Sequence, residues 1–584
     1  MAFQDFEYIT ERRRAEKQRK LRKRIAMAAV SAFALVALIA VAVFVGVGKS
    51  NDSDTKAAQP HQQAANESSQ THSTNKVIQM ICHSADYKEK CENILTRAVK
   101  ANPDLCHPKD LLKTAISATA DEVNNAMNKT IGFKYNTPAE KAAFEDCMVL
   151  MQEAKEELGF SVFQVGNSDL GELSSRTPKL NNWLSAVMSY QQTCIDGFPQ
   201  GKLKDSVEKA FEGVKELTSN SLAIVSEVAL FLSTFQEAGG HSRHLLEKDG
   251  YPTWMAHEDR RMLKAQDEKP TPNVTVAKDG SGDYNTISGA LAAMPEKYQG
   301  RYVIYVKAGV YKETVTVTKE MVNVTMYGDG SQKSIITGSK NFVDGVRTFE
   351  TATFVALGEG FLAKAMGFRN TAGPEKGQAV AARVQADSSV FVNCRFEGYQ
   401  DTLYAQTHRQ FYKSCVIAGT VDFIFGDAAA VFQNCLIVVR KPLDNQKNVV
   451  TAQGRIDKRE TTGIVLHKCR ILPDNKLVPF KSKISSYLGR PWKEYSRTVV
   501  MESTIDDIIH PDGWLPWEGD FGLNTLYYAE FNNIGPGAKV LARVNWPGHK
   551  LINQQEAFQY TVGPFLHGDW INATGAPVHF GLYT

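Results

Sequence analysis

The sequence lacks the patterns by which many enzymes hold a metal ion or an organic cofactor. Its 13 histidines are scattered, and the pair at ligand spacing, His241 and His244, falls in a polar segment between two regular regions. No glycine-rich loop stands before a helix in the arrangement that cradles phosphate groups. We therefore expect no metal and no organic cofactor, and we expect no nucleic acid partner.

The chain also has little net charge: the formal value is +3 over 584 residues, a length that predicts two or three structural units. Residues 1–24 hold 9 basic and 4 acidic side chains (+5), residues 25–263 hold 23 and 29 (−6), and residues 264–584 hold 35 and 31 (+4). A basic C-terminal part suits a polyanionic partner, and an acidic middle part suits docking onto it. Solvated faces with no partner explain the same numbers, so that alternative stays open.

One long uncharged and almost wholly apolar run, residues 25–48, lies near the N-terminus. Its 24 residues are enough to cross a bilayer as a helix, and the basic residues of segment 1–24 predict that this end stays cytosolic. We expect an uncleaved type II signal anchor in the Golgi or another endomembrane, with a cleaved signal peptide as the alternative. Residues 49–76 lack large apolar side chains and predict a disordered tether. Glycosylation sequons at Asn51, Asn66, Asn128, Asn273, Asn323 and Asn572 are consistent with the secretory route.

From residue 77 to residue 237 the apolar residues recur at helical spacing, in segments such as 111–127, 139–158 and 206–235. Four cysteines fall where they can staple a small helical bundle: Cys82 and Cys91 close together, and Cys147 and Cys194 farther apart. A polar linker, residues 238–271, follows this helical region.

After residue 272 short apolar runs alternate with Gly, Asn and Asp turns, which predicts strands over 302–307, 313–317, 322–327, 390–396, 431–439 and 463–471. A unit of the form apolar-x-x-Cys-x-apolar recurs around Cys394, Cys415, Cys435 and Cys469, and the first three cysteines are 21 and 20 residues apart. Such repetition is typical of a solenoid, in which each coil buries its apolar side chains against the next coil. We expect residues 272–584 to form an all-β right-handed parallel β-helix.

Five ordered motifs in this region resemble those of plant pectin methylesterases. They are Gly309-Val-Tyr-Lys-Glu313, Gln378-Ala-Val-Ala381, Gln400-Asp-Thr-Leu-Tyr404, Gly419-Thr-Val-Asp-Phe-Ile-Phe-Gly426 and Leu488-Gly-Arg-Pro-Trp492. The resemblance implies hydrolysis of the methyl esters of homogalacturonan, giving de-esterified pectin and methanol. It makes Asp422 the nucleophile and Asp401 the proton donor and acceptor, with Gln400 as the transition-state stabiliser. It also implies substrate contacts by Thr348, Gln378, Arg490 and Trp492.

Residues 77–237 resemble the pectin methylesterase inhibitor domain, an all-α four-helix bundle with an N-terminal helical hairpin. This resemblance implies disulfides between Cys82 and Cys91 and between Cys147 and Cys194, and it leaves Cys106 unpaired. In the solenoid the resemblance implies a Cys415–Cys435 disulfide. We expect Cys394 and Cys469 to stack inside the solenoid.

The linker contains Arg243-His-Leu-Leu246 and Arg260-Arg261-Met-Leu263, which resemble the signal at which subtilisin-like proteases separate inhibitor from enzyme in this family. Neither segment matches the Arg-Arg-Leu-Leu type fully, and an uncut linker is the alternative. A zymogen-like chain that is processed on the way to the cell wall is the resulting hypothesis. A helical domain that is only a spacer or a folding aid remains the alternative.

Other interpretations of the site residues also remain open. Asp401 before Thr402 is compatible with a turn, and Asp422 with Arg490 is compatible with a structural ion pair. The aromatic residues Tyr404, Phe425, Trp514 and Trp517 suit a core as well as a sugar-binding cleft. Rival functions are a pectate lyase or polygalacturonase on the same solenoid and an inactive pectin-binding or inhibitory wall protein.

Overall fold

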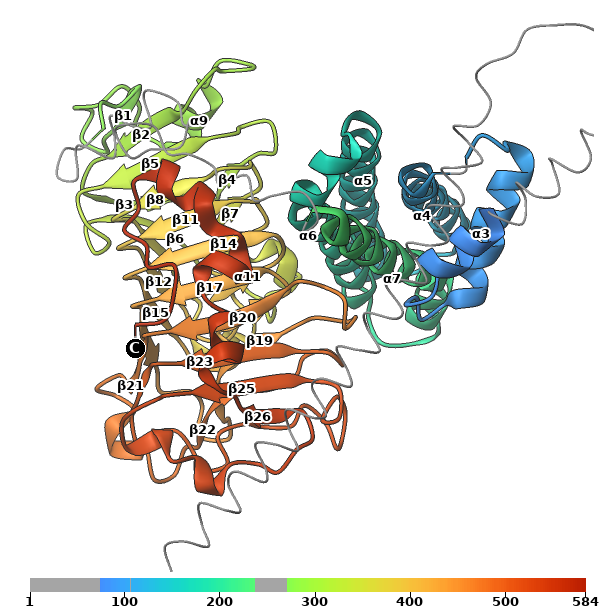
Figure 1. The fold of residues 1–584 in the computed structure, drawn as a ribbon. Coiled ribbons are helices and arrows are strands. Elements are labelled where there is room, and N and C mark those ends of the chain that lie inside the picture. Colours follow the sequence, from blue (N-terminus) through green and yellow to red (C-terminus); the bar gives the residue numbers. More distant parts are fainter. Residues whose placement is uncertain (1–73, 106, 237–269, 584) are drawn as a thin grey trace, which may run out of the picture. The chain divides into compact units, whose positions relative to one another are not determined.

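The computed structural model describes residues 74–105, 107–236 and 270–583, and Figure 1 shows a helical region followed by a β-rich region. The predicted membrane anchor and tether, Cys106 and the processing residues Arg243, Arg260 and Arg261 lie outside the described residues. Across the described residues, no helix combines the length and apolar character needed to cross a membrane.

Four long helices make up most of the helical region: α4 (Pro108–Ile131), α5 (Pro138–Asn167), α6 (Leu170–Asp196) and α7 (Lys202–Gln236). The start of α5 is encoded locally, because Thr137 and Glu140 form a capping box and Pro138 occupies the first turn. Each predicted helical segment lies inside one of these helices, and α6 is an addition. Its interior Pro178 interrupts the helical pattern of the sequence, so periodicity alone did not predict this helix.

An N-terminal hairpin precedes the four helices. Helical residues 74–81 and helix α3 (Lys88–Ala101) are joined by the Cys82–Cys91 disulfide, and a second disulfide links Cys147 on α5 to Cys194 on α6. Both predicted pairings are confirmed. Apolar side chains of α3 to α7 fill one continuous core, so the bundle expected from the sequence is present.

The β-rich region consists of three sheets of parallel strands. The first contains β1 (Val274–Val276), β2 (Tyr302–Val306), β5 (Val324–Gly328), β8 (Leu362–Lys364), β11 (Ser389–Val392), β14 (Arg409–Lys413), β17 (Ala429–Gln433), β20 (Gly463–His467), β23 (Arg497–Met501), β25 (Tyr527–Phe531) and β26 (His549–Leu551). The second contains β4 (Val315–Val317), β7 (Phe354–Ala356), β10 (Ala382–Val384), β13 (Leu403–Ala405), β16 (Ile424–Gly426), β19 (Asn448–Gln453) and β22 (Ser486–Gly489). The third contains β3 (Gly309–Lys312), β6 (Ser334–Gly338), β9 (Gly367–Asn370), β12 (Arg395–Glu397), β15 (Val416–Gly419), β18 (Leu436–Val439), β21 (Arg470–Pro473) and β24 (Thr504–Ile505).

From β2 to β25 successive strands along the chain fall in different sheets, so the central coils contribute a strand to each face of a parallel β-helix. Side chains from all three sheets meet in one interior core. On the outer face of the first sheet, α10 (Gln554–Phe558), α11 (Val562–Leu566) and the 3-10 segment η6 (Gly568–Thr574) cover a second apolar layer (Figure 1). Residues 73–584 form one compact unit.

The recurring cysteine unit is a corner between two strands. Residues Asn393, Ser414, Asn434 and Lys468, each directly before a cysteine, all have φ between 52° and 58°. This left-handed conformation turns the chain from the first sheet into the third and lets the cysteine point into the core. The predicted single strands 390–396, 431–439 and 463–471 are therefore wrong as continuous elements, because each divides at its corner residue into two strands.

The four corner cysteines Cys394, Cys415, Cys435 and Cys469 are buried free thiols. The predicted Cys415–Cys435 disulfide is therefore wrong, whereas the stacked Cys394 and Cys469 are confirmed. Because β15 and β18 pair in register, the two thiols stack one above the other at a coil spacing of about 4.8 Å. A disulfide needs Cβ atoms roughly 3.8 Å apart, which is closer than this coil spacing.

Candidate active site

Asp401 and Asp422 hold equivalent positions on neighbouring coils. Each stands two residues before a strand of the second sheet, and β13 and β16 pair with Leu403 opposite Ile424. The backbone N–H of Asp401 donates to the carbonyl oxygen of Val421 (3.0 Å), which ties the two turns together. The predicted pair of carboxylates therefore lies on one face, about one strand spacing apart.

Both aspartates adopt left-handed backbone conformations, with φ of 60° at Asp401 and 50° at Asp422. Such angles are uncommon for residues other than glycine and are maintained only where surrounding contacts hold them. One such contact is at Gly419, where a Cβ would stand 2.3 Å from the Cβ of Phe423. The absence of a side chain at Gly419 lets the turn that carries Asp422 close tightly.

Arg490, directly after β22, reaches Asp422 from a distant part of the sequence. Its Nε donates to Oδ1 (2.8 Å) and its Nη2 donates to Oδ2 (2.6 Å), which is a bidentate arrangement. The guanidinium also lies 4.2 Å from the centre of the Trp517 ring. The pair orients the Asp422 carboxylate, because the planar guanidinium engages both of its oxygens.

The environments of the two carboxyl groups differ in charge. Burial and the neighbouring charge of Asp422 raise the pKa of Asp401 well above its usual value. Burial also raises the pKa of Asp422, but the hydrogen bonds and charge of Arg490 oppose that rise. Asp422 is therefore the group that ionises first, and Asp401 keeps its proton, which is the separation expected of a nucleophile and an acid.

A cavity of about 500 Å³ opens over the two aspartates. The seven catalytic and substrate-binding residues predicted from the sequence all line it: Thr348, Gln378, Gln400, Asp401, Asp422, Arg490 and Trp492. Thr348 begins the 3-10 turn η1 (Thr348–Glu350). The tertiary structure thus brings together residues that span more than 140 positions in the sequence.

Aromatic rings form much of the cavity wall. Tyr404 and Phe425 stack with ring centres 4.3 Å apart, and Trp492 meets Phe425 edge to face. Trp517 lines the cavity beside Arg490, whereas Trp514 is 1% exposed in the interior core. The open choice between core and cleft is therefore settled in favour of the cleft for Trp517 and of the core for Trp514.

Two basic residues at the rim were not singled out from the sequence. Arg347 precedes Thr348, Lys493 follows Trp492, and both line the cavity. A search for positive charge next to the predicted substrate-binding residues would have found them, because the resemblance implies a polyanionic substrate.

The helical region completes the cavity. The residues Asp146 and Leu150 of α5 and Thr193 and Asp196 of α6 also line it. Asp146 accepts a hydrogen bond from Arg347 (2.6 Å), and Asp196 accepts one from Lys493 (2.7 Å). The hydroxyl groups of Thr193 and Tyr404 lie 3.2 Å apart.

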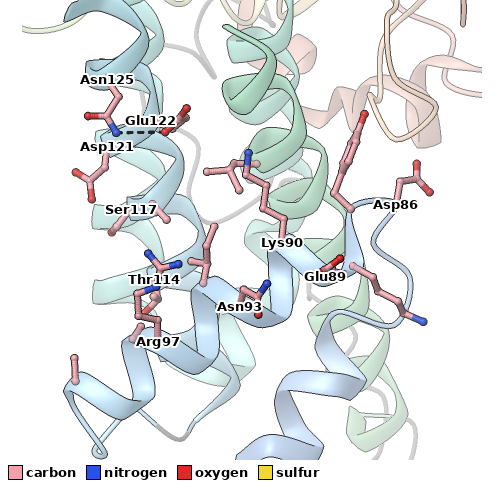
Figure 2. A pocket seen from close by; sticks show the side chains of 17 residues that line it. Asp86, Glu89, Lys90, Asn93, Arg97, Thr114, Ser117, Asp121, Glu122 and Asn125 are labelled. Atoms are coloured by element: carbon pink, nitrogen blue, oxygen red, sulfur yellow. Dashed lines mark hydrogen bonds between the residues drawn. The ribbon is translucent and has the colours of Figure 1, made fainter. Parts of the chain in front are cut away.

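A larger open depression, of about 1050 Å³, lies on the helical region and shares no residue with this cavity. Figure 2 shows carboxylates and basic groups around it, among them Glu89, Lys90 and Arg97 from α3 and Asp121 from α4. Among the residues described, no three His, Cys, Asp or Glu side chains are grouped to hold a metal ion. The paired carboxyl groups of unequal pKa lie in the cavity on the β-helix, so that cavity is the candidate active site.

A parallel β-helix that presents two neighbouring aspartates, one held by arginine, is compatible with a carboxylic ester hydrolase. The comparisons name the family. The family model described as Pectinesterase matches residues 273–569, and the model described as Plant invertase/pectin methylesterase inhibitor matches residues 76–224. This chain belongs to the pectinesterase family and carries an inhibitor-like domain in front of the enzyme domain.

Two curated relatives from Arabidopsis thaliana match over their full lengths and over all of this chain. The proteins named pectinesterase/pectinesterase inhibitor 45 and pectinesterase/pectinesterase inhibitor 13 are 52% and 51% identical to it. Among solved structures, the pectin methylesterase from carrot is 53% identical, with a TM-score of 0.53, and covers 54% of this chain and 99% of its own.

Proposed function

We propose that the chain, which is a pectinesterase, removes methyl groups from homogalacturonan through an acyl-enzyme formed on Asp422. The ionised Asp422 attacks the C6 carbonyl carbon of a methylated galacturonate unit. The oxygen of the tetrahedral intermediate accepts hydrogen bonds from the side-chain amides of Gln400 and Gln378, each worth about 3 kcal/mol of barrier. Asp401 gives its proton to the departing methoxy oxygen, so methanol leaves.

Water completes the cycle. The ionised Asp401 takes a proton from a water molecule, whose oxygen attacks the acyl carbon attached to Asp422. Collapse of the second intermediate returns Asp422 as a carboxylate and releases the galacturonic acid group, which then loses its proton to solvent. The proton that Asp401 lost in the first half-reaction is restored in the second, so the two groups finish as they began.

The observation that carries this proposal is the unequal pair itself: Asp422 is bound by Arg490 and Asp401 is not. Asp422→Asn keeps the shape of the side chain and removes the attacking charge, so methanol release from methylesterified pectin is expected to fall at least about 10³-fold with pectin binding retained. Asn substitution of Asp387, a buried carboxylate paired with Arg409 outside the cavity, is the matched control. If Asp422→Asn released methanol as fast as the Asp387→Asn control, its role as nucleophile would be refuted. Loss of pectin binding by Asp422→Asn would instead point to a structural role.

We further propose that the helical domain inhibits the enzyme domain in the uncut chain. Asp146 pairs with Arg347, and Asp196 pairs with Lys493. A polyanionic pectin chain would otherwise bind these two basic rim residues. Leu150 and Thr193 line the same cavity as the two aspartates. A tethered domain acts at a high effective concentration, so its rim contacts need little intrinsic affinity to exclude pectin.

The test compares the uncut chain with the same chain after its linker, residues 238–271, has been cut and the helical part removed. Methanol release is expected to rise at least about tenfold on removal. The double variant Asp146→Asn/Asp196→Asn should be partly active without cutting, whereas Asp121→Asn, an exposed change on α4, should behave as the parent. Full activity of the uncut parent would instead support a folding aid.

Processing and location follow from the same proposal. A subtilisin-like protease would cut near Arg243 or after Arg260-Arg261 in the secretory pathway, and the enzyme domain would then reach the cell wall, where its polymer lies. Membrane attachment through residues 25–48 before processing remains part of this proposal. Replacing Arg243, Arg260 and Arg261 together should hold the chain at full size, which immunoblotting of secreted protein measures.

A further inference from the structure

A loop far from the aspartates makes a second set of contacts with the helical domain. This loop, residues 454–462, connects β19 and β20, and none of residues 455–462 lines the cavity over Asp401 and Asp422. Pectin in the cavity would therefore not compete for the loop. The two contact regions are separable, and they need separate explanations.

The loop is held in shape by its own hydrogen bonds. The buried Glu460 accepts from the backbone N–H groups of Ile456 (2.9 Å) and Asp457 (2.7 Å), and Asp457 accepts from the N–H of Arg459 (2.8 Å). Arg455 donates to the carbonyl oxygen of Tyr495 (2.7 Å), which fixes the start of the loop. A preformed loop loses little conformational entropy when it binds a partner.

Arg459 recognises the hairpin that precedes the bundle. Its guanidinium donates to both carboxylate oxygens of Asp86 and to the carbonyl oxygen of Ser84, and Lys458 adds a bond to Asp86 (2.8 Å). Ser84 and Asp86 lie within the segment closed by the Cys82–Cys91 disulfide. Figure 2 shows Asp86 on the turn that leads into α3.

Neutral contacts surround this charged pair. Ile456 is 6% exposed and packs into the apolar core of the bundle. Ser219 of α7 donates to Asp457 (2.6 Å), and the backbone N–H of Thr461 donates to Ser185 of α6 (3.2 Å). A buried apolar anchor beside a well-packed arginine is typical of an interaction hot spot.

We propose that loop 454–462 is a docking site for the disulfide-closed hairpin of the helical domain, and that it retains this domain after the linker is cut. The inference rests on the proposed inhibitory role and adds a second, substrate-independent contact to it. Arg459 is the principal specificity residue, because it accepts only a partner that presents a carboxylate next to a free carbonyl oxygen.

The charge of the partner persists through the acidic range of a plant wall. The Arg459 guanidinium lowers the pKa of Asp86 to about 2. Because a lowered pKa favours the ionised form, the pair is present above that value and is lost only as the pH falls through it. The ion pair between Asp86 and Arg459 is therefore expected to persist between about pH 4 and pH 7.

The experiment uses the full chain with a specific protease site placed in the linker and an affinity tag at the C-terminus. After cutting without reductant, the enzyme part is immobilised and the rate at which the helical part leaves is measured. Arg459→Ala should speed release at least about tenfold, and Asp86→Asn should do the same from the other side. Lys481→Ala, which breaks the exposed pair with Asp507, is the matched control.

The charge reversal Arg459→Asp with Asp86→Arg should slow release again relative to Arg459→Ala. Methanol release by the separated Arg459→Ala enzyme should equal that of the parent, which shows that the variant is folded. The proposal would be overturned if Arg459→Ala released the helical part no faster than Lys481→Ala does. It would also be overturned if the two parts of the parent separated immediately after cutting. If the uncut parent is fully active but Arg459→Ala still speeds release, inhibition fails and docking stands.

Discussion

Arg490 offers the sharpest test of how the site divides its two carboxyl groups. Its two hydrogen bonds favour the ionised form of Asp422, and a hydrogen bond to a charged group contributes about 1.5–3 kcal/mol. Taking about 3 kcal/mol for the pair, and 1.36 kcal/mol for each pKa unit, Arg490→Met should raise the pKa of Asp422 by about 2 units.

The sign of the effect on activity follows from the mechanism. Asp422 must be ionised to attack, so raising its pKa moves the acidic limb of the pH profile of kcat/KM to higher pH by about 2 units. At a pH on the original limb the loss is about 100-fold, and it becomes smaller as the pH rises. Arg490→Lys should fall between the parent and Arg490→Met, because it keeps the charge and loses the bidentate geometry.

The assay is methanol release from methylesterified pectin between pH 4 and pH 9, measured on the cut and separated enzyme part. Arg369→Met is the matched control, since Arg369 pairs with Glu397 on the outside of the β-helix. A loss of equal size at every pH, with an unmoved acidic limb, would show that Arg490 only shapes the site. The ordering of Asp422 before Asp401 would then be refuted.

Three further predictions concern single residues. Asp401→Asn should reduce kcat at least about 10³-fold, because both half-reactions use its proton, and a variant with KM changed and kcat retained would contradict this role. Trp492→Ala should raise KM by about tenfold with a smaller change in kcat, since the ring lines the cavity without reaching the aspartates, and pectin oligomers of graded length measure it. Cys435→Ser should cost about 1 kcal/mol, not the roughly 2–4 kcal/mol of a lost disulfide, and denaturant unfolding together with mass mapping of the non-reduced protein distinguishes the two.

Local patterns in the sequence were sufficient for the types of element and for the chemistry. The apolar periodicity of α4, α5 and α7 and the 21- and 20-residue spacing of the corner cysteines depend on neighbouring residues, and each predicted its element. Ordered motifs likewise indicated the residues of the site, because each motif combines a turn with one functional side chain.

Local sequence patterns did not predict the corners of the solenoid. A left-handed residue such as Asn393 or Lys468 changes the direction of the chain without interrupting the run of apolar residues, so one continuous strand was predicted where there are two. The Cys415–Cys435 pairing failed for a related reason. Sequence spacing shows that two cysteines stack, but the distance between them in the folded chain decides whether they can bond.

By itself, the sequence determined the two domains, the family and the identity of the two aspartates, because motifs and periodicity are properties of short segments. Only the tertiary structure decided that Arg490 engages Asp422 through two hydrogen bonds, that burial raises the pKa of Asp401, and that Trp517 lines the cavity while Trp514 lies in the core. Contacts between distant segments also decided which surfaces of the helical domain meet the enzyme. Such choices depend on burial and on electrostatics across coils, and those arise only when the chain is folded.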